Sequence, residues 1–163
     1  MSLKDQIKND IKEAMKAGDS QRKTVLSMLS SVIKNRELEK KTKLVKDGGD
    51  QATVDQLSQL SEEEVIESVG SEVKKRKDSI VAFEGAGRPE LAQSEKEELE
   101  MLMKYMPEQM SDEQIRSEVK ATIDSMPGVT IKDMGKVIGQ VMPKVKGKAD
   151  GQKVSQIVKE LLS

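Results

Sequence analysis

The sequence predicts an all-α fold built from two small helical domains. Apolar residues recur every three or four positions along most of the 163 residues, as they do on the buried face of an amphipathic helix. No segment alternates apolar and polar residues in the way that predicts a β-strand. Pro107 separates longer predicted helices from shorter ones, so we expect domains at residues 1–106 and 107–163.

The first domain is predicted to begin with two helices. A capping pattern starts the first helix at Ser2, and Gly18 ends it. The second helix begins at Asp19 or Ser20 and extends to about Val45. The apolar residues assigned to the core faces of these helices are Leu3, Ile7, Ile11, Met15, Val25, Leu26, Met28, Leu29, Val32 and Ile33.

Residues 46–60 interrupt the helical pattern. They are polar and rich in turn-forming residues, which predicts a flexible loop inserted between the second and third helices. Because the entropy of closing a loop changes slowly with its length, we expect most of this segment to be dispensable for stability.

Two further helices complete the first domain. Ser61 and Glu64 form a capping box for the third helix, and Pro89 suits the first turn of the fourth. Pro107 ends the fourth helix. The apolar residues that follow helical spacing here are Ile66, Val69, Val73, Ile80, Phe83, Leu91, Leu99, Leu102 and Met103.

Shorter helices are predicted after Pro107. Ser111 caps the first of them, Asp133 helps to open the second, which Pro143 closes, and Asp150 caps the last. The segments "MGKVIGQVM" and "VSQIVKELL" share one apolar spacing, which predicts a helical hairpin. Its core is expected to contain Met134, Val137, Ile138, Val141, Met142, Val154, Ile157, Val158 and Leu161.

Several catalytic chemistries are excluded by composition. The chain has no cysteine and no histidine, which removes thiol nucleophiles, Cys/His zinc sites and histidine acid–base catalysis. No phosphate-binding loop or dinucleotide-binding motif is present. A serine–lysine pair stays open, but nothing singles one out. We therefore expect no catalytic residues, no metal and no cofactor, and a protein that is not an enzyme by itself.

Charge is spread unevenly along the chain. The net charge is −1, yet residues 131–163 hold seven lysines and three acidic residues, giving +4. A basic end on an acidic chain favours an anionic partner. The candidate nucleic-acid-binding residues are Lys132, Lys136, Lys144, Lys146, Lys148 and Lys153. A solvated basic loop without a ligand is the alternative.

Three glycines accompany these lysines. Gly135 and Gly139 lie on one side of a predicted helix, and together they cost about 2 kcal/mol of helix propensity relative to alanine. The favoured explanation is close packing against a neighbouring helix, and the alternative is close approach of a ligand. Gly147 is expected to let the chain turn.

The nature of the partner is constrained by the rarity of aromatic residues. Only Phe83 and Tyr105 are aromatic, so no platform exists on which single-stranded bases could stack. Lysines would instead contact the phosphates of a folded RNA such as tRNA. A protein-interaction adaptor in translation or tRNA metabolism, without RNA contact, is the alternative.

The first residues suggest a location. The segment "MSLKDQIKNDIKEAM" resembles neither a secretory signal nor an Arg-rich transit peptide, and no apolar run is long enough to span a bilayer. We therefore expect a cytoplasmic protein with no membrane partner.

Two segments carry a resemblance to a known family. "DMGKVIGQVMPKVKGKADGQKVSQIVKELL" resembles the C-terminal signature of the GatB/YqeY family, and "RKDSIVAFEGAGRPELAQSEKEELEMLMKYMPEQMSDEQI" resembles its middle segment. The resemblance to stand-alone YqeY-like proteins covers nearly the full length, apart from residues 46–60. The positions that match the signature are Gly135, Lys136, Gly139, Lys146, Gly147, Ala149 and Val154.

The resemblance implies a fold and a context. The second domain would be equivalent to the tail of the B subunit of the tRNA-dependent amidotransferase, which helps to position misacylated tRNA while glutamine donates the amide. The catalytic portion of that subunit has no counterpart here, so a label of carbon–nitrogen ligase would come from the larger enzyme. An amidotransferase or a translation factor is the protein partner that the resemblance suggests.

Overall fold

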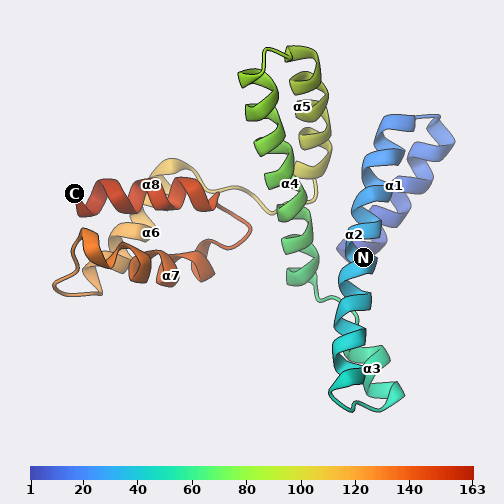
Figure 1. The fold of residues 1–163 in the computed structure, drawn as a ribbon, viewed down its shortest axis with the longest axis horizontal. Helices are drawn as coiled ribbons and strands as arrows, with labels where there is room; N and C mark the ends of the chain where they lie inside the picture. Colours follow the sequence, from blue (N-terminus) through green and yellow to red (C-terminus); the bar gives the residue numbers. More distant parts are fainter. The chain divides into compact units, whose positions relative to one another are not determined.

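The computed structural model describes residues 1–163 and confirms the all-α fold. It contains eight α-helices, one short 3₁₀ helix and no strand. The chain divides into two compact units, Met1–Tyr105 and Met106–Ser163, which are described separately (Figure 1). No helix combines the length and the apolar character that crossing a membrane requires.

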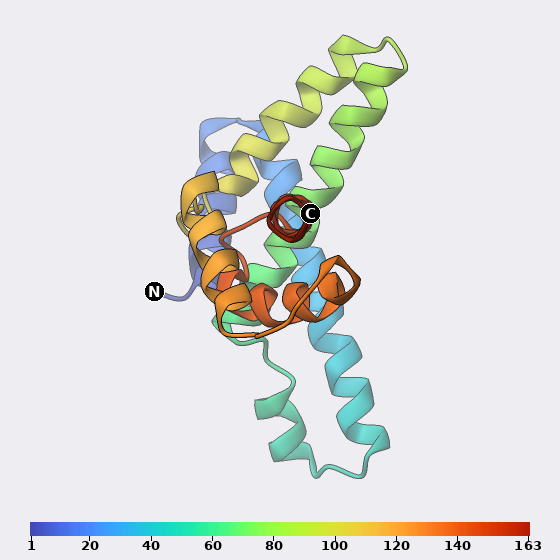
Figure 2. The same ribbon diagram turned by 90° about the vertical axis from the view of Figure 1, so that its left-hand side faces the viewer.

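The first unit opens with the helical pair α1 (Leu3–Ala17) and α2 (Ser20–Lys46), which lie side by side in Figures 1 and 2. Ser2 caps α1, and Gly18 ends it with a left-handed φ of 69°. Ile7 and Ala14 are buried on α1, and Val25, Leu26, Leu29 and Ile33 are buried on α2. Two residues assigned to the core are exposed instead, Met15 at 58% and Met28 at 50%.

The prediction of a flexible loop across residues 46–60 is wrong. Residues Gln51–Leu57 form the helix α3, which Asp50 caps by accepting a hydrogen bond from the Thr53 N–H. Val54 is buried at 1% exposure, and α3 packs against α2. A helix this short is marginally stable by itself, so α3 depends on its packing against α2. The spacing of apolar residues in the sequence therefore could not predict it.

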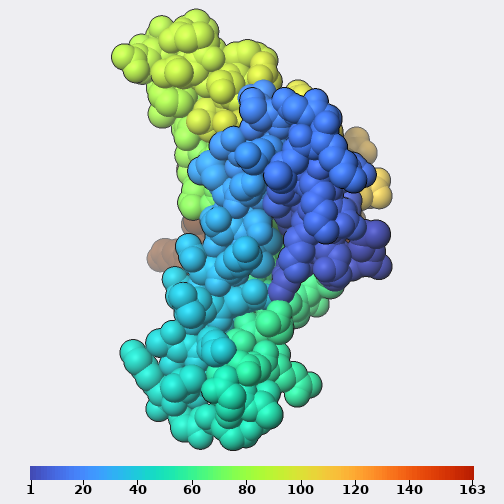
Figure 3. All heavy atoms as spheres, turned by 90° about the vertical axis from the view of Figure 1, so that its right-hand side faces the viewer, coloured from blue at the N-terminus to red at the C-terminus, as the bar shows by residue number.

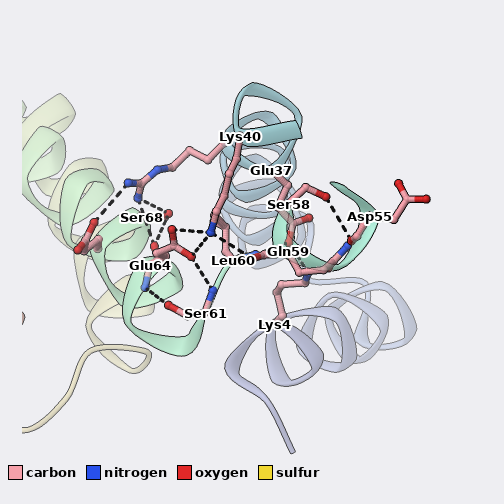
Figure 4. Close-up of polar contacts among 12 residues, drawn as sticks. Lys4, Glu37, Lys40, Asp55, Ser58, Gln59, Leu60, Ser61, Glu64 and Ser68 are labelled. Carbon is pink, nitrogen blue, oxygen red and sulfur yellow. Dashed lines mark hydrogen bonds and ion pairs between the residues drawn. The ribbon is translucent and has the colours of Figure 1, made fainter. Parts of the chain in front are cut away.

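A polar network holds the end of this segment. Glu37 accepts hydrogen bonds from the ammonium of Lys4 and from the backbone N–H of Leu60 at 3.1 Å (Figure 4). Lys40 binds both carboxylate oxygens of Glu64 at 2.9 Å. The contacts tie the start of α1 and the α3–α4 connection to the middle of α2.

Helices α4 (Glu62–Gly85) and α5 (Pro89–Met103) form the second pair, which lies side by side in Figures 1 and 2. The capping box of Ser61 and Glu64 and the N-terminal position of Pro89 are as predicted. Just after α5, the Tyr105 hydroxyl donates a hydrogen bond to Asp10. The pKa of Tyr105 is raised, mainly because the side chain is buried and also because of this hydrogen bond. The contact fastens the end of the unit to α1.

The second unit is a three-helix cluster of α6 (Asp112–Asp124), α7 (Met134–Val145) and α8 (Gly151–Leu162), with the 3₁₀ helix η1 (Ile131–Asp133) before α7. The predicted hairpin core is confirmed. The buried residues of this core are Ile115, Val119, Val137, Val141, Val145, Val154, Ile157 and Val158. Met134, Ile138, Met142 and Leu161 pack against them.

One predicted boundary is wrong. Pro143 does not end α7 but lies inside it, and the helix continues to Val145. Val145 is fully buried in the core of the unit, so packing holds the last turn despite the hydrogen bond that proline cannot donate.

Candidate nucleic-acid interface

The loop between α7 and α8 carries Lys146 and Lys148 and is fixed in place. Gly147 adopts a φ of +74°, a left-handed conformation that favours glycine, and it therefore turns the chain as expected. The Gln109 side chain donates to the Gly147 carbonyl at 2.8 Å, and the Met110 N–H donates to the Lys148 carbonyl at 2.8 Å. The backbone of this loop is thus held by the segment that precedes α6.

Lys136, Lys144 and Lys153 pair with acidic side chains of the same unit. Lys144 contacts Glu118 at 3.1 Å, Lys136 contacts Asp133 at 3.2 Å, and Lys153 contacts Asp112. Lys144 also donates to the Thr122 hydroxyl at 3.1 Å. The three lysine side chains remain 46% to 74% exposed, and exposed pairs of this kind contribute little stability. A stronger anion could therefore replace these carboxylates at small cost.

Asp133 illustrates the local electrostatics. The backbone N–H of Thr130, and then the Lys136 ammonium, lower the pKa of Asp133. The carboxylate belongs to the capping box of η1, where it accepts a hydrogen bond from the Thr130 N–H at 3.1 Å, and it also binds the Lys136 ammonium in the first turn of α7.

Lys132 and Lys148 differ from the other lysines. Both are exposed, and their side chains make no hydrogen bond or ion pair within the chain. Lys146 is also exposed but has an interaction within the chain. All six lysines thus lie on the surface of one unit. Among these candidates for RNA binding, Lys132 and Lys148 are the two whose charge no acidic side chain offsets.

The prediction that Gly135 and Gly139 pack closely against a neighbouring helix is wrong. A Cβ atom added at either position would meet nothing within 4 Å, and both glycines are exposed. The core face of α7 is formed by Val137, Val141 and Val145. Gly139 lies two residues from both Val137 and Val141, which places it on the opposite side of the helix. That spacing was already visible in the sequence.

The charge balance changes once the folded unit is considered. Residues 131–163 carry +4, but they share a compact unit with α6 and its flanks. Residues 106–163 together hold nine basic and eight acidic side chains, a net charge of +1. Electrostatic attraction of RNA would therefore depend on local positions rather than on the charge of the whole unit.

The fold defines the class as an all-α protein of two small helical units, without a cluster of three or more acidic side chains that could hold a metal. Within that class, the chain belongs to the YqeY-like protein family, whose model matches residues 4–162. The family resemblance drawn from the sequence is thereby confirmed.

Similar fungal proteins share the name "Altered inheritance of mitochondria protein 41, mitochondrial". The Candida glabrata protein is 31% identical over 138 residues, which cover 80% of this chain and 68% of the relative. The Clavispora lusitaniae protein is 32% identical over 120 residues, covering 72% of this chain and 61% of the relative. A Saccharomyces cerevisiae relative (strain YJM789) is 30% identical over 122 residues, 74% of this chain and 58% of its own length. The match therefore spans less than two thirds of the last two relatives.

These names overturn the predicted cytoplasmic location. The similar proteins are named as mitochondrial, whereas the expectation rested on the first fifteen residues and on the lack of an apolar run that could span a bilayer.

Proposed function

We propose that the second unit binds structured RNA, with tRNA as the first candidate, and that the chain is an accessory module without catalytic activity of its own. The proposal rests on family membership and on the resemblance of this unit to the tail of an amidotransferase subunit that positions tRNA. The proposal relates the chain to amidotransferase function through this family resemblance alone.

The observation that carries the proposal is the outer face of α7. Two glycines lie there without any element of the chain to cover them, next to exposed lysines at positions 132 and 136. Gly139 lies in the interior of α7, where glycine costs about 1 kcal/mol relative to alanine, and internal packing does not offset that cost. A polyanionic backbone that approaches the helix closely would use both the missing side chains and the adjacent charges.

Salt dependence of tRNA binding tests the proposal. Replacing Lys132, Lys136 and Lys148 by alanine should remove about three phosphate contacts and flatten the slope of log affinity against log salt by roughly 2 to 3 units. Exposed lysines of the first unit provide a control of equal charge, Lys12, Lys16 and Lys23 replaced together by alanine. Equal losses in both triple variants, or a parent protein that does not bind tRNA, would reject the site.

A protein adaptor without RNA contact is the second candidate. It is favoured by the net charge of only +1 on the second unit and by the carboxylates that already pair with Lys144 and Lys153. Affinity capture from cell extract with and without RNase separates the two candidates. Partners that survive RNase, together with no direct tRNA binding by the purified chain, would support the adaptor.

A further inference from the structure

The outward side of α2 carries a seven-residue repeat that the chain itself does not use. Six residues follow one another at alternating spacings of three and four, the pattern of the contact positions in a two-stranded coiled coil. We name this set the outer stripe: Met28, Ser31, Asn35, Leu38, Thr42 and Val45.

All six residues of the outer stripe are exposed. Leu38 is 60% exposed, Val45 55% and Met28 50%. The opposite side of α2 supplies the buried residues and also Arg36 and Lys40, which bind α4. Figure 3 shows the atoms of α2, light blue to cyan, open to solvent down this side of the first unit, with α1 beside them. The stripe is therefore an unpartnered helix face.

We propose that the outer stripe pairs in parallel with the outer stripe of a second copy of this chain. In a parallel pair, like positions face each other, so Asn35 meets Asn35 and Leu38 meets Leu38. A buried asparagine at such a contact position bonds its twin and specifies two strands in one register. Asn35 thus favours a two-stranded pair in one register over non-specific association, at some cost in stability.

The flanking charges agree with the parallel orientation. Lys34 and Glu39 border the stripe on opposite sides, five residues apart, the separation at which side chains pair between parallel coiled-coil helices. Neither makes an ion pair or a side-chain hydrogen bond within its own chain. By symmetry each dimer would gain two Lys34–Glu39 contacts. An antiparallel pair centred between Asn35 and Leu38 would instead bring Lys34 towards Lys41.

One flanking contact opposes the parallel pair. Lys41 would face Lys46 of the second copy, but Lys41 already contacts Asp55 on α3 at 2.7 Å, which reduces the repulsion. The outer stripe covers 18 residues of helix, about 27 Å. Because so short a seam is smaller than a standard interface, the dimer should dissociate on dilution.

Sedimentation equilibrium of the full chain over a range of concentrations tests the proposal. The parent should change reversibly from monomer to dimer. Leu38→Glu should weaken dimerisation at least about tenfold, because two carboxylates would face each other in the seam. Leu57→Glu is the matched control, since Leu57 is 51% exposed on α3 and lies outside the stripe, and it should leave dimerisation unchanged. A parent that stays monomeric at every concentration, or equal losses in both variants, would overturn the proposal.

A charge exchange tests the orientation without changing the stripe itself. Lys34→Glu and Glu39→Lys should each weaken the dimer, and the double variant should recover the parent's affinity. Because the chain contains no cysteine, Asn35→Cys gives a second test on a clean background. It should form a disulfide-linked dimer under mild oxidation, whereas Val81→Cys, 70% exposed on α4, should not. No recovery in the double variant, or equal cross-linking of both cysteine variants, would refute the parallel pair.

Discussion

Replacing Gly139 by alanine should stabilise the second unit. Gly139 lies in the middle of α7, its φ is not positive, and an added Cβ would meet nothing within 4 Å. The substitution therefore removes the conformational cost of glycine in a helix, about 1 kcal/mol, without a steric penalty. The new methyl group would be exposed, so burial adds nothing to this figure.

Gly147→Ala is the matched control, since the same change in the same unit is expected to have the opposite effect on stability. Its φ of +74° is a left-handed conformation that costs an alanine about 1–2 kcal/mol. Gly147→Ala should therefore destabilise the unit while Gly139→Ala stabilises it.

Amide hydrogen exchange of α8 gives the free energy of unfolding of this unit separately from that of the first. Gly139→Ala should slow the exchange of the most protected amides, such as that of Val158, by about fivefold. A loss of stability in Gly139→Ala would show that the outer face of α7 is packed against something. It would remove the premise of the proposed RNA interface.

Three further outcomes are expected. Val158→Asp should unfold the second unit, at a cost of roughly 4 kcal/mol or more, because it places an unpaired carboxylate at a fully buried position; circular dichroism and thermal melting would detect it. Val54→Asp should melt α3 for the same reason, seen as rapid exchange of the amides of residues 51–57, and full protection would show that α3 does not depend on this contact. Burial alone would raise the pKa of Glu37, yet the Lys4 ammonium and the Leu60 N–H hold it below its usual value. The stability that this carboxylate contributes is therefore present above its unfolded pKa of about 4.3 and is lost as pH falls through the folded pKa, so Glu37→Gln should flatten the acid limb of a stability–pH profile.

Local signals in the sequence predicted most helix boundaries. The capping boxes at Ser61 and Ser111 act within four residues of the chain, so their chemistry can be read without knowledge of the fold. The short helix α3 could not be found in this way. Its single buried side chain, Val54, and the ion pair of Asp55 with Lys41 depend on α2, which tertiary structure brings to it.

The two sides of long helices were harder to distinguish. Met28 follows Val25 by three residues and fits the apolar face, yet Val25 is buried and Met28 is half exposed. Both the buried face of α2 and its outer stripe contain apolar residues. The spacing of apolar residues in the sequence therefore does not show which of the two faces is buried. The candidate lysines are exposed, but the pairing of Lys144 and Lys153 with carboxylates on α6 could be seen only in the folded unit.

The outer face of α7 and the outer stripe of α2 both carry residues that disfavour stability or solubility, and no contact within the chain compensates for them. Helix α7 contains glycines where alanine would make the helix more stable, and α2 exposes Leu38 and Val45 where charged residues would make the protein more soluble. Residues that contradict local preference without an internal gain are expected at functional surfaces. The two faces belong to different units, so they need not serve one partner. Dimerisation through α2 would then present two second units per assembly, and two weak RNA contacts could act together even though each unit carries a net charge of only +1.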